Sequence, residues 1–166
     1  LVNDKVRNLL KNYYHGNFKV TRFYFGRNYH VPNQILDKQE VFSNRWHCDG
    51  DNTTFVKLFL YLSDVTEKDG PFHIQGKKRT KELIKMGFGN RNNYKISTEE
   101  LDKDVTKLKG QKGTIFLCNC QMGLHRAGVP DIGHYRDHII IQFGPSNKPL
   151  SDDWAKEFFD PHAIDF

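Results

Sequence analysis

The sequence predicts a mainly β protein, an antiparallel barrel or jelly roll with helices at its periphery. Segments with strand-like alternation lie on both sides of a polar, helix-prone stretch, residues 77–112. Glycine-rich turns separate these segments, which is typical of antiparallel folds. The 13 Phe and 7 Tyr residues support this prediction, because aromatic side chains favour strands.

The first elements are a helix followed by a strand. Residues 2–14 carry apolar side chains near helical spacing, which predicts a short helix. Residues 18–26 alternate as a strand does, and we expect that strand to end at Gly26. Residues 27–40 are predicted to form a loop. An extended segment then covers residues 40–49 and ends in the turn residues that follow Asp49.

Residues 55–65 form the clearest strand of the sequence. Its even-numbered members from Val56 to Leu62 share one face, and Lys57, Phe59 and Tyr61 share the other. A turn at residues 67–72 follows. In the polar excursion at 77–112, Ser97 and Glu100 have the spacing of a helix capping box.

Two further strands are predicted after the excursion, at residues 110–121 and 136–144. The segment between them contains a turn, residues 123–128, which carries His125. The tail begins at Pro145 and contains Trp154, and we expect its aromatic residues to pack back on the body of the protein.

Length and composition indicate one domain over residues 1–166, of ordinary globular composition. Mean hydropathy is −0.69, and the sequence has no apolar run of the ~18 residues that a membrane span requires. The chain begins with Leu1, which leaves room for a preceding segment. Three cysteines form a poor disulfide framework, so we expect a cytoplasmic protein. The net charge of +5 is the one feature that favours nucleic acid, and no nucleic-acid motif accompanies it.

The pair His47 and Asp49 is a candidate for binding a metal. Residues i and i+2 of an extended segment point the same way, so both side chains can reach one ion. The H-x-D pattern is weak by itself, because such pairs also arise by chance and at polar turns. A non-haem iron(II) oxygenase requires a second histidine, and His125 is the candidate that follows a buried-looking strand.

Arg136 is the fourth candidate site residue and lies 11 residues after His125. A 2-oxoglutarate co-substrate needs a fixed cation for its far carboxylate, and arginine pairs with carboxylates in a bidentate manner. Strand alternation places Arg136, His138 and Ile140 on one face.

At this point the sequence resembles the phytanoyl-CoA dioxygenase-like branch of the iron(II)/2-oxoglutarate dioxygenases. The resemblance covers residues 46–143 and includes, in order, WHCDGD, FVKLFLYLSDV, DGPF, GTIFLCN, LHRAG and YRDHIIIQF. It implies a double-stranded β-helix, a cupin-like jelly roll, with iron held by His47, Asp49 and His125. It also implies that Arg136 binds 2-oxoglutarate and that Phe59 lies against this co-substrate.

Two departures from the family pattern bear on catalysis. The Ser or Thr that often follows the distal histidine by two residues is Ala127 here, and the proline-glycine-serine-histidine segment is replaced by IQGKKRT. A polar group that the family supplies ahead of the H-x-D pair has only Arg22 or Lys19 as candidates.

The sequence offers further candidates with simpler explanations. Lys77 and Lys78 open a basic cluster that either anchors an acidic substrate group or forms a solvated loop. Cys118 and Cys120, with His125, are conceivable zinc ligands, but their spacing and the strand alternation favour small buried residues. Lys57, on the face of Phe59, could reach toward the pocket, but we expect its amine to extend from a strand end to solvent. His73 and His134 are expected to be ordinary loop residues.

We therefore expect an iron(II)- and 2-oxoglutarate-dependent dioxygenase that hydroxylates a small molecule, using O2 and releasing succinate and CO2. The resemblance favours hydroxylation over halogenation, because Asp49 is a carboxylate at a position that halogenating relatives leave open. The alternative is a non-catalytic, cupin-like domain that binds a metal or a small ligand. The sequence predicts neither a membrane partner nor an oligomeric state.

Overall fold

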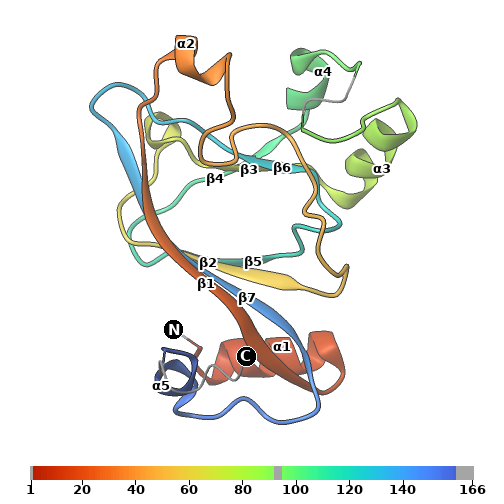
Figure 1. The fold of residues 1–166 in the computed structure, drawn as a ribbon, viewed down its shortest axis with the longest axis vertical. Coiled ribbons are helices and arrows are strands. Elements are labelled where there is room, and N and C mark those ends of the chain that lie inside the picture. Colours follow the sequence, from red (N-terminus) through yellow and green to blue (C-terminus); the bar gives the residue numbers. More distant parts are fainter. Residues whose placement is uncertain (1, 92–94, 160–166) are drawn as a thin grey trace.

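The computed structural model describes residues 2–91 and 95–159, which are mostly β with antiparallel pairing. A four-stranded sheet has the order β1-β7-β2-β5, and a three-stranded sheet has the order β4-β3-β6. The two sheets lie opposite each other (Figure 1). The strands are β1 (Asn17–Tyr29), β2 (Val56–Tyr61), β3 (Phe72–Ile74), β4 (Thr106–Leu108), β5 (Ile115–Cys118), β6 (His125–Ala127) and β7 (Tyr135–Ser146).

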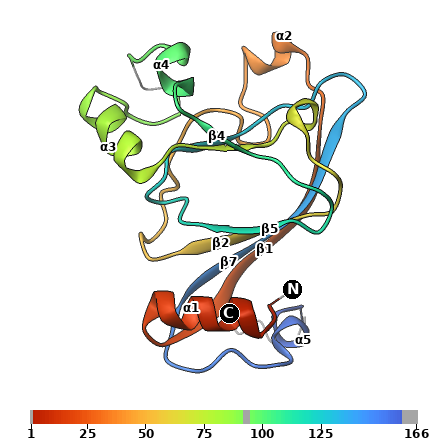
Figure 2. The same ribbon diagram turned by 180° about the vertical axis from the view of Figure 1, so that it is seen from behind.

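Helices cover the outer sides of both sheets, as Figure 2 shows from behind. Below the larger sheet lie α1 and α5, whereas α2, α3 and α4 lie on the side of the smaller sheet. A single 3-10 turn, η1, precedes β3. The helices are α1 (Asp4–Tyr14), α2 (Asn33–Leu36), η1 (Glu67–Asp69), α3 (Lys77–Lys85), α4 (Thr98–Asp102) and α5 (Trp154–Phe159). Among the described residues, no helix has the length and apolar character needed to cross a bilayer.

The long pairing of β1 with β7 corrects the predicted end of the first strand. Gly26 pairs with His138, and the ladder continues to Tyr29 opposite Tyr135. The neighbouring strand supplies hydrogen bonds along this whole length, and a glycine does not end a strand that remains paired. Residues 27–29, predicted as loop, therefore belong to β1, and α2 occupies part of the remaining loop.

The alternation predicted for residues 56–61 is confirmed. Val56, Leu58 and Leu60 pack into the core under the larger sheet, whereas Phe59 packs into a second cluster between the sheets. The prediction was wrong for Leu62, whose side chain is 39% exposed, because β2 ends one residue earlier.

The N-terminal helix and the tail close the core beneath the larger sheet. The side chain of Asn3 accepts a hydrogen bond from the Val6 amide and caps α1, which buries Leu10 against the sheet. Trp154 packs against the same core, and Arg7 donates a hydrogen bond of 2.9 Å to the Leu150 carbonyl. The predicted packing of the tail is thus confirmed for Trp154, whereas Phe158 and Phe159 are 37% and 56% exposed.

The polar excursion contains the predicted helices and one strand that was not predicted, β4. The Ser97 hydroxyl accepts from the Glu100 amide, as expected for a helix cap, but the Glu100 carboxylate forms an ion pair with Arg79. A third apolar cluster includes residues of α3 and α4, on the side of the smaller sheet. Its buried members are Trp46, Leu83, Phe88, Leu101 and Leu124.

Two local predictions next to the candidate metal site were wrong. Residues 40–49 are mostly irregular rather than one extended segment: Phe42 and Ser43 form a turn with positive φ, and His47 alone forms a β bridge. His125 lies in a strand, β6, rather than in a turn. Pairing with β3, which aligns Ile74 with His125, supplies the hydrogen bonds that make this short segment a strand.

Candidate metal centre

Backbone hydrogen bonds bring the two predicted histidines together from distant parts of the chain. The His47 amide donates to the His125 carbonyl at 3.0 Å, and the His125 amide donates to the His47 carbonyl at 2.9 Å. The Asp49 amide donates to the Cys120 carbonyl at 3.0 Å. Three separate amides therefore fix the positions of the predicted ligands.

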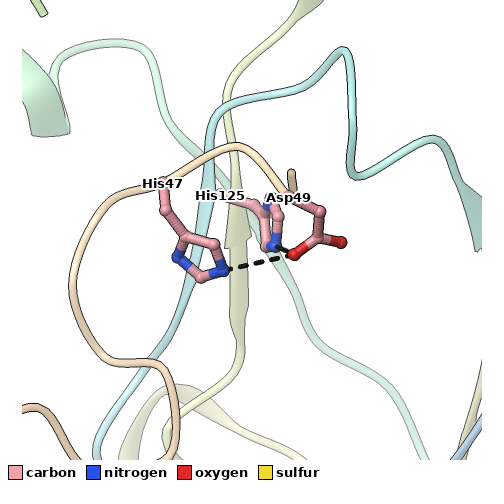
Figure 3. Close-up of side chains that lie close together, drawn as sticks. All are labelled: His47, Asp49 and His125. Carbon is pink, nitrogen blue, oxygen red and sulfur yellow. Dashed lines mark ion pairs between the residues drawn. The ribbon is translucent and has the colours of Figure 1, made fainter. Parts of the chain in front are cut away.

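The side chains of these three residues converge on one point (Figure 3). One ligand atom from each of His47, Asp49 and His125 lies within 4.8 Å of the others. Asp49 Oδ1 is 3.5 Å from Nε2 of His47 and 3.7 Å from Nε2 of His125. Two imidazole nitrogens and one carboxylate oxygen form the donor set typical of non-haem iron sites.

The outer nitrogen of each imidazole is held by a backbone carbonyl. His47 Nδ1 lies 2.8 Å from the Arg45 carbonyl, and His125 Nδ1 lies 2.9 Å from the Gly123 carbonyl. A carbonyl can only accept, so each Nδ1 carries the proton and each Nε2 keeps its lone pair. Metal-binding histidines usually have such an outer partner, which fixes both the tautomer and the ring orientation.

The protonation states of the cluster favour a cation. Burial, with the nearby imidazole of His47, lowers the pKa of His125 to about 4, so this ligand is neutral at pH 7. Burial alone would raise the pKa of Asp49, but the contacts of its carboxylate with His47 and Lys57 outweigh burial and hold this pKa below its usual range. At pH 7 the cluster therefore presents a neutral His125 and an anionic Asp49.

The cluster lies in the wall of an open cavity of about 600 Å³. Phe59, Phe72 and Ala127 line it beside the histidines. The ring of Phe59 stacks on Phe116 with centroids 4.8 Å apart, and the Phe72 ring stacks against His125 at 5.3 Å. These aromatic contacts restrict the rotation of the His125 ring and make one wall of the cavity apolar.

Arg136 lines the same cavity, and among the described residues no carboxylate forms an ion pair with it. Its side chain is only 4% exposed, and Nη1 has no hydrogen-bond partner among the described residues. Burial lowers the pKa of Arg136 to about 10, which leaves the guanidinium charged at pH 7. A buried cation without a partner is costly, so the geometry calls for an anionic ligand at this point.

The contact between Lys57 and Asp49 was not predicted from the sequence. The lysine amine was expected in solvent, yet Nζ lies 2.7 Å from Asp49 Oδ2. The alternation of β2 gave a usable signal, because Lys57 shares the face of Phe59, which lines the cavity. Arg22 also lines the cavity, at its edge, where it pairs with Asp51 at 2.8 Å.

The structure brings the remaining candidates to other places. Lys77 and Lys78 begin α3 and do not line the metal cavity; Lys77 borders a separate, shallower hollow beside β3. Their role as a substrate anchor stays a prediction. Cys118 and Cys120 are free, with sulfurs 3.0 Å apart, and among the described residues they belong to no metal-ligand cluster.

The two other histidines differ from each other. His134 lies outside the strands and helices and bonds Asp69 at 2.8 Å. The prediction was wrong for His73, which is buried in β3.

No protein-family model matches this sequence, and no curated protein matches it. Solved structures share its fold at low identity. The non-haem monooxygenase ThoJ has a TM-score of 0.59 at 12% identity, and the alignment covers 90% of this chain and 55% of ThoJ. Iron-bound HygX from Streptomyces hygroscopicus has a TM-score of 0.56 at 14% identity, over 92% of this chain and 72% of HygX.

A third neighbour is the epimerase SnoN in complex with Fe3+, alpha-ketoglutarate and nogalamycin RO. Its TM-score is 0.56 at 11% identity, over 84% of this chain and 54% of SnoN. HygX has also been solved with nickel and 2-oxoglutarate bound. The chain spans just over half the length of ThoJ and SnoN. These likenesses show a fold found in non-haem, 2-oxoglutarate-dependent enzymes.

Proposed function

We propose that this chain carries the catalytic centre of an iron(II)- and 2-oxoglutarate-dependent oxygenase. One observation carries the proposal: Arg136, whose buried Nη1 has no hydrogen-bond partner among the described residues, lines the same cavity as the His47–Asp49–His125 cluster. A metal cluster alone would fit many functions. A metal cluster that shares its cavity with an isolated buried cation fits a metal-chelating co-substrate with a distant carboxylate.

In this proposal His47, Asp49 and His125 hold Fe(II). The donor set suits iron(II), and a set of three ligands on one face leaves positions for 2-oxoglutarate and O2. When bound, the iron and 2-oxoglutarate supply the activation of O2 and the electrons for substrate oxidation. The carbonyl partners of both histidines support the assignment, since they keep each Nε2 available to a cation.

Arg136 binds the far carboxylate of 2-oxoglutarate in this proposal, and Phe59 and Phe72 border the co-substrate with apolar surface. The apolar wall excludes water and strengthens the charge pairing at Arg136. The remaining cavity accepts a small-molecule substrate, for which we propose hydroxylation. Because the neighbour SnoN is an epimerase, product analysis must separate oxygen insertion from a change of configuration.

We also propose the finer assignments suggested by sequence resemblance. These are the phytanoyl-CoA dioxygenase-like branch, the double-stranded β-helix topology and a single domain over residues 1–166. The motifs that resemble this branch, in the same order over residues 46–143, support the assignment to it. The two opposed antiparallel sheets are compatible with the double-stranded β-helix topology.

The test begins without oxygen. Addition of Fe(II) and 2-oxoglutarate to the protein is expected to give a visible charge-transfer band, and admission of air is expected to give succinate. Arg136→Met should raise the KM for 2-oxoglutarate roughly 30-fold or more, because losing one partner of a buried charge pair costs at least about 2 kcal/mol. Arg79→Met is the matched control, because Arg79 does not line the cavity and already pairs with Glu100.

The alternative is a domain that binds a metal and a small ligand without turnover. Ala127 favours it, because this cavity residue has no hydroxyl with which to hold the co-substrate. The same experiment separates the two. A charge-transfer band that yields no succinate in air, with or without a panel of small-molecule substrates, would favour the non-catalytic domain.

A further inference from the structure

Lys57 makes a contact with the metal cluster that the proposed ligand set does not use. Its amine lies 2.7 Å from Asp49 Oδ2. Both side chains are largely buried, with 16% of Lys57 and 13% of Asp49 exposed. A salt bridge this sheltered is geometrically restrained, unlike the exposed pairs of the surface.

The two oxygens of Asp49 have different partners. Oδ1 faces both imidazoles, at 3.5 Å and 3.7 Å from their Nε2 atoms, whereas Oδ2 bonds Lys57. The carboxylate is thus divided into one oxygen directed at the cluster and one directed away from it.

Lys57 is well placed to maintain this division. It lies in β2, an inner strand of the larger sheet, where it is aligned with Cys118 on one side and with Gln142 on the other. The Asp49 amide is itself bonded to the Cys120 carbonyl, two residues beyond Cys118. The ammonium group and the backbone of its carboxylate partner are therefore fixed to the same part of the fold.

We propose that Lys57 is a positioning residue that restricts Asp49 to binding the metal through Oδ1 alone. The proposal rests on the proposed function, since it assigns Asp49 as a metal ligand. A carboxylate that binds through both oxygens fills two positions on an ion. By occupying Oδ2, Lys57 keeps one more position open for the co-substrate or O2.

A competing effect has the opposite sign. An ammonium group close to a divalent cation repels it, so removal of Lys57 would tighten metal binding if charge were all that mattered. Lys57 and Asp49 neutralise each other within the pair, however, and outer partners of metal ligands typically contribute 10–100-fold to metal affinity. We therefore expect positioning to outweigh repulsion.

The test measures Co2+ binding under anaerobic conditions by titration of its visible absorption. In Lys57→Met we expect Co2+ to bind about 10–100-fold more weakly than in the wild type, with a changed absorption that reports a different coordination. Lys57→Arg keeps a cationic donor and should recover most of the affinity. Lys107→Met is the matched control, because Lys107 is also a strand lysine that pairs with a carboxylate, Glu67, but belongs to β4.

A second readout follows the open coordination position. When 2-oxoglutarate is added to the Co2+ protein, its dissociation constant should rise by roughly the same factor in Lys57→Met, and Lys57→Arg should again restore it. Unchanged or tighter Co2+ binding by Lys57→Met, beside a wild type that binds Co2+ and 2-oxoglutarate, overturns the role of Lys57 and leaves the proposed function standing. A wild type that binds no Co2+ overturns both.

Folding is tested separately, in metal-free protein. Lys57→Met leaves the buried Asp49 carboxylate unpaired, so its melting temperature should fall, and the added change Asp49→Asn should restore part of the loss. If Lys57→Met does not fold, Lys57→Gln replaces it in the comparison, because glutamine keeps a neutral hydrogen-bond donor. Lys57→Gln is expected to bind Co2+ more weakly than Lys57→Arg and more tightly than Lys57→Leu, which has no donor.

Discussion

His73 illustrates how a single buried residue supports the backbone beside the proposed metal centre. It lies in β3, 7% exposed, and its Nδ1 accepts a hydrogen bond of 3.1 Å from Arg126. Arg126 also bonds Asp102 and lies over the ring of Trp46. Arg126 and Trp46 directly adjoin the proposed ligands His125 and His47 in the sequence, so this network helps to fix the backbone that carries both imidazoles.

The protonation of His73 makes the stability of this network depend on pH. Burial, followed by the charges of Arg126 and Lys107, lowers the pKa of His73 to about 4 from an ordinary 6.5. As the pH falls below 6.5, His73 becomes protonated in the unfolded chain, whereas in the folded chain it stays neutral until about pH 4. The free energy of unfolding therefore decreases across this window, by about 2 kcal/mol for this residue between pH 7 and pH 5.

Urea unfolding at pH 7 and pH 5 checks this prediction. His73→Gln retains an acceptor for Arg126 and cannot titrate, so it should lose about 2 kcal/mol less than the wild type between the two values. An equal loss in both proteins would show that other groups cause the pH dependence.

At the scale of elements, the turn between η1 and β3 depends on one glycine. Gly70 has a φ of +64°, and a Cβ atom there would lie 2.6 Å from the Pro130 amide nitrogen and 2.7 Å from the Gly128 carbonyl oxygen. The neighbouring Gly128 amide donates to the Pro71 carbonyl at 2.9 Å. This close approach aligns β3 with β6, and β6 carries His125.

Gly70→Ala should accordingly lower stability by more than about 2 kcal/mol, because the positive φ and the backbone clash both add strain. Gly76→Ala is the matched control: Gly76 has a φ of −60°, and an added Cβ would meet nothing within 4 Å. Thermal unfolding of the two variants measures the difference. Similar melting temperatures would contradict the assigned role of Gly70.

At the scale of the whole molecule, the predicted ligands join parts of the chain that are distant in sequence. His47 comes between β1 and β2 of the larger sheet in the sequence, and His125 lies in β6 of the smaller sheet. A metal that binds all three ligands binds only the folded chain, and such a ligand stabilises the fold by mass action.

Mn2+ at 100 times its dissociation constant should thus stabilise the protein by about 2.7 kcal/mol, which corresponds to a rise in melting temperature of roughly 5–10 °C. A chelator should reverse the rise, and Asp49→Asn should diminish it strongly. Differential scanning calorimetry provides the measurement. A rise of equal size in Asp49→Asn would show that the ion binds elsewhere.

Much of the fold and the site could be predicted from local pattern. The strand at 55–65 was recognisable because burial on two different faces imposes alternation on its side chains, and α1 because one of its faces packs on a sheet. The candidates His47, Asp49, His125 and Arg136 followed from ligand chemistry and spacing, and the structure brings all four to one cavity.

What the sequence by itself determined, then, is which side chains alternate, where the apolar faces lie and which residue types are able to bind a metal. Tertiary structure alone decided that His125 lies in a strand, that β1 continues past Gly26, that Lys77 and Lys78 lie away from the cavity, and that the Lys57 amine meets Asp49. The physical reason is that alternation and propensity act between neighbours in the chain. Strand pairing and burial depend instead on segments that can lie more than a hundred residues apart, as β1 and β7 do, and no local pattern records their contacts.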